Sequence, residues 1–256
     1  MITCRSAEEL VKLRAANQLV ARILEDLRRL VVPGATTAGI DAEAERLVGV
    51  AGAQPAFKGY RGFPATICAS RNHEVVHGIP SSQALVEGDI LSIDMGVKLD
   101  GWYGDSAVTV GVGAIAPEAQ RLLDVTEASL YKGIDAVRPG ARVSDIGQAV
   151  QAYVEAQGFT VVREFVGHGI GTKLHEEPQI PNYGPGGRGP RLAEGMVLAI
   201  EPMVNAGRAA VRVLSDGWTA ITVDGTLSAH FEHTVAVTAD GVEILTLRPA
   251  AMASGR

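Results

Sequence analysis

Hydrophobic residues in the first part of the chain recur at three- and four-residue intervals, which is the spacing of an amphipathic helix. Ser6 and Glu9 stand at the spacing of a capping box, so we expect the first helix to begin after Ser6 and to end before Pro33-Gly34. The same reasoning predicts further helices over residues 37–50, 117–137 and 144–157.

Short apolar runs bounded by turn residues predict strands between these helices. Ile90–Val97 and Asp105–Val110 flank Asp100-Gly101, a hairpin signal, so we expect them to pair and to bring Asp94 close to Asp105. Other strands are predicted over 66–70, 160–166, 211–214, 218–223, 232–238 and 242–247. Segments 54–64 and 181–190 contain several Gly and Pro residues and predict loops.

Two stretches of the chain share one pattern. Leu85–Asp94 and Leu192–Glu201 each contain a turn with Gly, then an apolar run, then a carboxylate. An ionised carboxylate on a buried strand is costly unless a positive charge compensates it. The pattern therefore predicts two half-sites that face a common group of cations.

Three further sequence echoes occur in the same order along the chain. The echoes are Pro33-Gly34 with Pro139-Gly140, His77-Gly78-Ile79 with His168-Gly169-Ile170, and Asp105–Val110 with Glu232–Val237. They predict an α+β fold of two duplicated halves about a pseudo-twofold axis. We expect one domain over residues 1–256, with an N-half of about 5–110, a C-half of about 117–247 and a short flexible tail at 248–256.

Composition narrows the class of protein. The chain of 256 residues is 46% hydrophobic and 20% charged, which is typical of one globular domain. A net charge of −6 without a basic run argues against nucleic-acid binding, and no apolar run reaches the roughly 20 residues that span a membrane. Widely spaced Cys4 and Cys68 and the lack of a signal-peptide pattern favour a reducing, cytoplasmic location.

The acids at the strand ends and one histidine form a candidate metal-binding set: Asp94, Asp105, Glu201, Glu232 and His168. Four carboxylates and an imidazole can hold two divalent ions. This mixed oxygen and nitrogen set suits Mn, Fe, Co or Zn better than Ca, and it lacks the thiolates of a structural zinc site. Such ions acidify a bound water and polarise a carbonyl, which indicates hydrolysis.

These residues carry a resemblance to a known family. The matching motifs are Asp94, Asp105, Gly167–Gly171, His175–Pro178, Ile200–Val204 and Glu232–Thr234. In order and spacing the chain resembles a type I methionine aminopeptidase from about Ser6 to Leu247. The resemblance implies the pita-bread fold, with antiparallel sheets covered by helices, and removal of the initiator methionine from nascent chains when the next residue is small.

The resemblance also implies roles at the metal site. Asp94 and Asp105 would bind the first ion, and His168 and Glu201 would complete the second. Asp105 and Glu232 would bridge the two ions. Glu201 would in addition act as the general base on the water.

Further roles concern the substrate. His175 would contact the substrate carbonyl and stabilise the oxyanion, and His77 would contact the scissile amide. The resemblance implies a methionine pocket lined by Tyr60, Phe63, Cys68 and Trp218, with Phe57 and Leu174 at positions where relatives vary. We expect His73, His230 and His233 to be bystanders, and the sequence assigns His230 no role.

Two other functions remain open at this point. A prolidase or aminopeptidase P would share the fold, but those relatives carry a further N-terminal domain. A non-catalytic binding protein would share it too, but such relatives lose metal ligands. The substrates expected here are nascent polypeptide N-termini. Contact with the ribosome would suit that activity, and the compact chain suggests a monomer.

Overall fold

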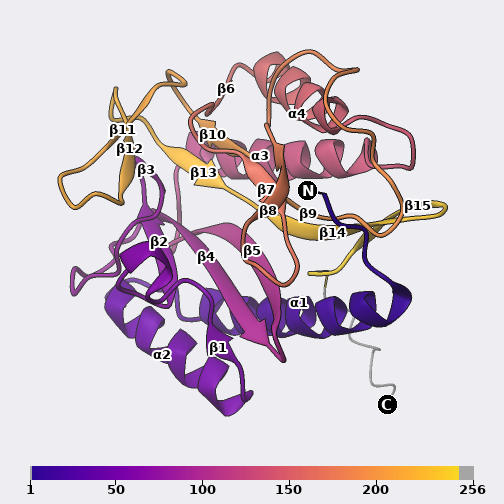
Figure 1. Ribbon diagram of the computed structural model, residues 1–256. Coiled ribbons are helices and arrows are strands. Elements are labelled where there is room, and N and C mark those ends of the chain that lie inside the picture. Colours follow the sequence, from indigo (N-terminus) through magenta and orange to yellow (C-terminus); the bar gives the residue numbers. More distant parts are fainter. Residues whose placement is uncertain (1, 248–256) are drawn as a thin grey trace, which may run out of the picture.

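The computed structural model describes residues 2–247 (Figure 1). The tail predicted at 248–256 lies outside the described residues. The helices are α1 (Ala7–Arg28), α2 (Thr37–Val50), α3 (Pro117–Asp135) and α4 (Val143–Ala156). Helix α1 begins with the predicted capping box: the backbone N–H of Glu9 donates to the Ser6 hydroxyl, and the backbone N–H of Ser6 donates to the Glu9 carboxylate.

A sheet in the N-half is built around one long hairpin. Strands β4 (Ile90–Leu99) and β5 (Trp102–Gly111) pair antiparallel over their full length, as predicted. The other edge of β4 pairs with β2 (Ile67–Arg71) and β1 (Gln54–Pro55). Gly104 allows α1 to pack closely on β5, because a Cβ there would lie 2.8 Å from the backbone of Ala16.

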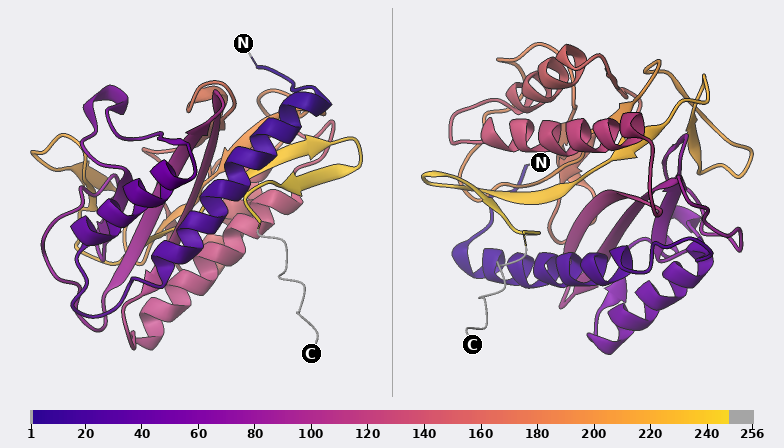
Figure 2. Two further views of the ribbon diagram at one scale, coloured as in Figure 1. Left: turned by 90° about the horizontal axis from the view of Figure 1, so that it is seen from below. Right: turned by 180° about the vertical axis from the view of Figure 1, so that it is seen from behind.

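The C-half contains a five-stranded sheet in the order β15-β14-β9-β7-β8. Its strands are β7 (Gly167–Gly169), β8 (Glu176–Ile180), β9 (Val197–Ile200), β14 (His233–Thr238) and β15 (Gly241–Ile244). Figure 1 shows the sheets between two helical layers, with α1 and α2 on one side and α3 and α4 on the other. The view from behind in Figure 2 shows the same layers. This arrangement buries an apolar face of each helix against the sheets.

Two small sheets complete the fold. One contains β6 (Thr160–Val161), β10 (Met203–Asn205) and β13 (Ser228–His230), and the other contains β3 (Glu74–Val76), β11 (Val211–Val213) and β12 (Ala220–Thr222). Strand β6 is shorter than the 160–166 predicted, and after buried Val162 the chain continues with exposed Arg163 and Glu164. Pairing of β3 with β12 joins the two halves.

Backbone hydrogen bonds show that the two halves repeat one another. The N–H of Gly34 donates to the carbonyl of Leu85 at 2.8 Å, and the N–H of Gly140 donates to the carbonyl of Leu192 at the same distance. Similarly, Gly88 donates to Val112 and Gly195 donates to Val237, both at 2.9 Å. The echoes at these turns therefore occupy equivalent places.

The two His-Gly-Ile triplets, in contrast, do not occupy equivalent places in the two halves. Ser92 and Ala199 are equivalent, since each stands two residues before the acid at the end of its repeat. His168 pairs with Ala199, whereas the residue that pairs with Ser92 is Ser70. His77 lies beyond β3, outside this register. The expectation that the two His-Gly-Ile triplets are equivalent was wrong, because a short motif does not fix which strand edge it joins.

Candidate active site

Two acids of the predicted set lie on the hairpin of the N-half. Asp105 on β5 pairs with Gly96 on β4, and Asp94 is two residues from Gly96. Side chains two residues apart point to the same face of a sheet, so Asp94 and Asp105 are diagonal neighbours on one face. The expected approach of these two acids follows from the hairpin register.

The other three residues come from the C-half. His168 is on β7, which pairs with β9, and Glu201 directly follows β9. Glu232 directly precedes β14, whose first residue His233 pairs with Ile200. This register places Glu232 across from Glu201. The N–H of Glu232 also donates to the carbonyl of Ala107 on β5, so the two sheets meet at the acids.

Interatomic distances show how closely four of these five side chains approach one another. His168 Nε2 lies 3.6 Å from Glu201 Oε1 and 3.8 Å from Asp105 Oδ2. Ligand atoms of Asp105, His168 and Glu232 lie within 4.8 Å of one another. Nδ1 of His168 is 2.9 Å from the carbonyl of Gly169 and donates to it, which leaves Nε2 as the free nitrogen that faces the acids.

Burial dominates the electrostatics of the acids. It raises the pKa of Asp94 to about 7 and the pKa of Glu201 to about 8. Burial and, after it, the neighbouring carboxylates hold the pKa values of Asp105 and Glu232 well above their ordinary ranges. Over residues 2–247, no Lys or Arg forms an ion pair with any of the four acids. The protein alone therefore leaves their charge uncompensated.

Unpartnered oxygen atoms indicate what would compensate that charge. Oδ1 of Asp94, Oδ1 of Asp105 and Oε1 of Glu232 are buried and have no hydrogen-bond partner within the described chain. Buried polar atoms are almost always partnered in native proteins. A set of carboxylate oxygens with one imidazole nitrogen fits divalent transition-metal ions. The residues present therefore fit a metal centre.

The support around Asp105 was not visible in the sequence. Its backbone N–H donates to Oδ1 of Asn17 at 3.2 Å, and its carbonyl accepts from the hydroxyl of Thr234 at 2.8 Å. Asn17 is fully buried on α1 and also donates to the carbonyl of Leu13. A polar residue on the apolar face of a predicted helix is the signal that points to such a role.

A cavity of about 180 Å³ has the acids in its lining and an aromatic and apolar wall beside them. It is lined by the predicted pocket residues Phe57, Tyr60, Phe63, Cys68, Leu174 and Trp218, together with His77, His175 and the five candidate ligands. Phe63 and Trp218 meet edge to face with ring centroids 5.2 Å apart. Burial raises the pKa of the Cys68 thiol, so this thiol stays protonated and is a lining group rather than a nucleophile.

Two further histidines border the cavity. His175 Nδ1 forms a 2.9 Å hydrogen bond with the Tyr60 hydroxyl, and its ring centroid is 4.2 Å from that of His168. The ring of His77 packs edge to face on Phe165 and Trp218. Burial lowers the pKa of His77 to about 4. Burial also lowers the pKa of His175, and the positive charge of Arg61 lowers it further. Both rings are therefore neutral at pH 7.

The remaining histidines differ in their relation to the site. His230 is 1% exposed, and its Nε2 lies 3.6 Å from Glu201 Oε2 without a hydrogen-bond partner in the described chain. It faces the acids, although the sequence assigned it no role. His233 points elsewhere and bonds with Tyr131 and Thr246, while His73 is exposed.

Comparisons with known proteins agree with this geometry. Residues 11–239 match Metallopeptidase family M24. Methionine aminopeptidase 1 of Bacillus subtilis is 55% identical over 246 residues, which cover 96% of this chain and 99% of the relative. The crystal structure of methionine aminopeptidase from Rickettsia prowazekii is 46% identical with a TM-score of 0.96, covering 96% of this chain and 100% of that chain.

The chain therefore belongs to metallopeptidase family M24, and within it to the methionine aminopeptidases. The pita-bread fold and the hydrolase class expected from the sequence are confirmed. A prolidase from Pyrococcus horikoshii shares the fold at 20% identity and a TM-score of 0.78. The structural match covers 97% of this chain but only 65% of that protein. None of the helices within residues 2–247 has the length and apolar character needed to cross a membrane.

Proposed function

We propose that this protein removes N-terminal methionine by hydrolysing the first peptide bond, with divalent metal ions held by Asp94, Asp105, His168, Glu201 and Glu232. The observation that carries this proposal is the placement of two buried and two partly buried carboxylates, which pair with no Lys or Arg of residues 2–247, and of one imidazole in a cavity with an apolar wall. The cavity has room for a single flexible apolar side chain, and the acids border it.

Charge balance supports two ions rather than one. Four ionised carboxylates carry four negative charges, which two divalent cations neutralise in a site from which water is largely excluded. The donor set suits Co, Mn, Fe or Zn, and supply in the cell would select among them. When bound, the ions supply an acidified water and a Lewis acid for the scissile carbonyl.

The proposal assigns proton transfer, charge stabilisation and contact with the scissile amide to side chains of the protein. Glu201 accepts a proton from the attacking water, for which its position beside His168 suits it. His175, held by the Tyr60 hydroxyl, directs its Nε2 at the substrate carbonyl oxygen and stabilises the charge that develops there. His77, which also lines the cavity, contacts the scissile amide nitrogen.

Substrate choice follows from the cavity. Phe57, Phe63 and Trp218 offer apolar and aromatic contacts that suit a thioether side chain. Restriction to a small second residue is inferred from the family resemblance. The polypeptides acted on would be nascent chains in the cytoplasm, where the unpaired cysteines Cys4 and Cys68 would stay reduced. A monomer suffices for this activity, and work near the ribosome would suit it.

A peptide assay with metal titration tests the proposal. Metal-free protein is loaded in turn with Co, Mn, Fe and Zn and given Met-Ala-Ser or an Xaa-Pro peptide. We expect cleavage of Met-Ala-Ser that a chelator abolishes and that saturates at two ions per chain. Cleavage of the Xaa-Pro peptide alone would show a prolidase-like enzyme, and activity that resists the chelator would contradict the metal assignment.

A further inference from the structure

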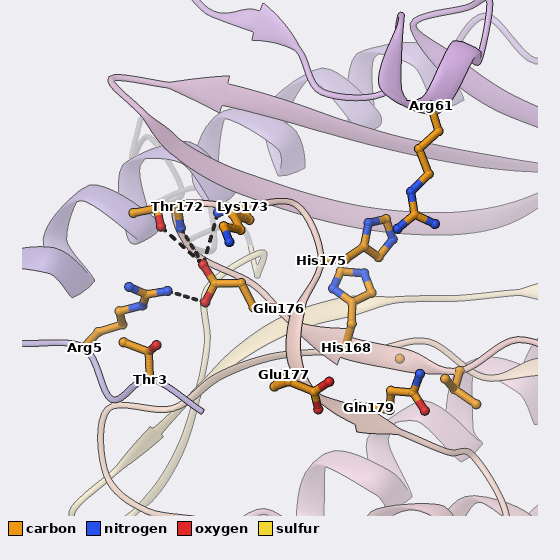
Figure 3. Close-up of a pocket in the computed structure, with 12 residues that line it drawn as sticks. Thr3, Arg5, Arg61, His168, Thr172, Lys173, His175, Glu176, Glu177 and Gln179 are labelled. Carbon is orange, nitrogen blue, oxygen red and sulfur yellow. Dashed lines mark hydrogen bonds and ion pairs between the residues drawn. The ribbon is translucent and has the colours of Figure 1, made fainter. Parts of the chain in front are cut away.

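A second, larger cleft of about 700 Å³ adjoins the cavity (Figure 3). Arg61, His168 and His175 line both spaces, so the cleft and the cavity share a border at the two histidines. On the proposed function, the N-terminal residue lies in the cavity and its carbonyl lies at His175. The residues that follow the scissile bond must therefore leave the cavity, and the shared border makes the cleft their path.

One pair of opposite charges in the cleft is neutralised within the protein. The guanidinium of Arg5 forms an ion pair with the carboxylate of Glu176, and both side chains are largely buried. The same carboxylate accepts hydrogen bonds from the backbone N–H groups of Thr172 and Lys173. Figure 3 shows these contacts gathered at one end of the cleft. At this end the carboxylate of Glu176 is therefore bound by the protein itself, while Lys173 beside it is exposed.

Arg61 is different. It is exposed, and no acidic side chain of the described residues pairs with its guanidinium, which lies 5.4 Å from the centre of the Tyr60 ring. Figure 3 shows the side chain extended toward His175, while the carboxylate of Glu177 lies on the far side of the histidines. The border of the cleft therefore presents an uncompensated positive charge.

The backbone fixes where this charge stands. Gly59 and Gly62 have φ of 84° and 92°, and Arg61 between them has φ of 49°. The N–H of Gly59 donates to the carbonyl of Phe63 at 2.8 Å and the N–H of Gly62 donates to that of Gly59 at 3.2 Å, which closes a tight turn. A non-glycine residue in the left-handed region is uncommon and marks a position that its surroundings hold in place. Arg61 is thus presented at the border by a constrained turn.

We propose that the cleft binds the residues after the scissile bond and that Arg61 selects peptides with an acidic side chain at the third or fourth position. A carboxylate there would meet a guanidinium that can bind it with two parallel hydrogen bonds. Because this contact forms on binding and persists in the transition state, it lowers KM and leaves kcat unchanged. The inference rests on the proposed function.

Amidated peptides test the inference, since they lack a C-terminal carboxylate of their own. Met-Ala-Asp-Ser-amide is compared with Met-Ala-Asn-Ser-amide, and Met-Ala-Ser-Asp-amide with Met-Ala-Ser-Asn-amide, using metal-loaded enzyme at low salt. We expect kcat/KM to be about three- to fivefold higher for the acidic peptide of at least one pair, through KM, and the ratio to fall toward one in high salt. Arg61→Gln should abolish the preference and Arg61→Lys should keep part of it.

Two controls make the result specific. Arg22→Gln changes an exposed arginine on α1 outside both spaces and should keep the preference. Lys173→Gln changes the other exposed cation of the cleft and should also keep it. Equal rates for acidic and amide peptides in the wild-type enzyme, or a preference that survives Arg61→Gln, would overturn this inference alone. Failure to cleave any Met peptide would overturn the proposed function as well.

Discussion

The two halves of the molecule repeat the same turns but contribute unequal ligands. The N-half supplies Asp94 and Asp105 from within a hairpin whose strands are ten residues each. The C-half supplies Glu201 and Glu232 from the ends of shorter strands, and it alone supplies the nitrogen of His168. Duplication thus explains Asp94 and Glu201, which end equivalent strands. The predicted equivalence of Asp105 and Glu232 was wrong, because Asp105 pairs with Gly96 whereas Glu232 lies opposite Glu201, an offset of two residues. The single imidazole is a further departure from symmetry.

The residue equivalent to His168 explains that departure. Ser70 occupies the matching register position, and its hydroxyl accepts the N–H of Gly78 at 3.1 Å. Ser70 therefore binds the backbone of its own half, and its side chain offers no nitrogen ligand. The comparison teaches that a duplicated scaffold can place one function in one half while the other half keeps a structural role.

The largest expected effect separates His168 from its sequence echo His77. His168→Ala should lose bound metal and about 10³-fold in turnover, because the site then lacks its nitrogen ligand. His77→Ala should keep the metal and lose roughly 10²-fold, because it contacts the substrate only. Metal analysis and turnover of both purified variants check this. Loss of metal from His77→Ala, or normal turnover of His168→Ala, would show that the halves are more alike than proposed.

Removal of metal should expose the charge that the two halves bring together. Burial raises the pKa of Asp94 to about 7 and of Glu201 to about 8, so the folded metal-free protein holds protons that the unfolded chain has lost. Its free energy of unfolding should therefore fall as the pH rises, by up to about 1.4 kcal/mol per pH unit for each such carboxyl.

The informative window runs from about pH 6.5 to 8. Below this window, burial lowers the pKa values of His77 and His168 to about 4 and about 3. These two histidines therefore make the free energy of unfolding rise with pH, opposite to the effect of the carboxyls. Thermal unfolding with a chelator or with saturating metal measures the effect. We expect the stabilisation by metal to grow with pH across this window, and a constant difference would contradict the placement of uncompensated acids.

A pair of glycines sharpens the comparison through stability. Gly88 and Gly195 are equivalent and have φ of 93° and 85°. A Cβ at Gly88 would meet nothing within 4 Å, but at Gly195 it would lie 2.6 Å from the carbonyl oxygen of Arg5. Gly88→Ala should cost about 1 kcal/mol from backbone strain, and Gly195→Ala about 3 kcal/mol because a clash adds to it.

Urea unfolding of the two variants checks this prediction. Gly34→Ala and Gly140→Ala serve as the matched control, because both glycines have positive φ and open space around the added Cβ. They should cost equal amounts. Equal costs for Gly88→Ala and Gly195→Ala would indicate that the N-terminal segment does not pack on the C-half.

The smallest effect concerns the cavity, to which both halves contribute. Trp218→Ala should reduce the preference for N-terminal Met over N-terminal Ala by roughly tenfold, because it removes apolar contact with the side chain and leaves the acids in place. The ratio of kcat/KM for Met and Ala peptides checks this. Phe63→Ala, which removes its edge-to-face partner from the N-half, should act in the same direction. An unchanged ratio of kcat/KM in both variants would show that the methionine side chain binds at another place.

Much of the fold could be predicted because its signals are local. The capping box at Ser6, the hairpin at Asp100-Gly101 and the Pro-Gly turns each act through neighbouring residues, and the structure contains all of them. The acids were recognisable because a carboxylate that ends an apolar strand needs a compensating charge. Long-range features were harder: the short β6, Asn17 behind Asp105 and His230 facing Glu201 depend on which elements meet.

The sequence by itself determined the four helices, the long hairpin of β4 and β5 and the identity of the residues able to bind metal, because periodicity, capping and the cost of a buried charge are properties of short stretches. Only the tertiary structure decided that Ser70 rather than His77 takes the place equivalent to His168, that His230 faces Glu201, and that Arg61 stands at the border of the cavity with no acidic partner among residues 2–247. Strand register and the packing of one half on the other set those places. Both depend on the free energy of contacts between residues that are far apart in the chain.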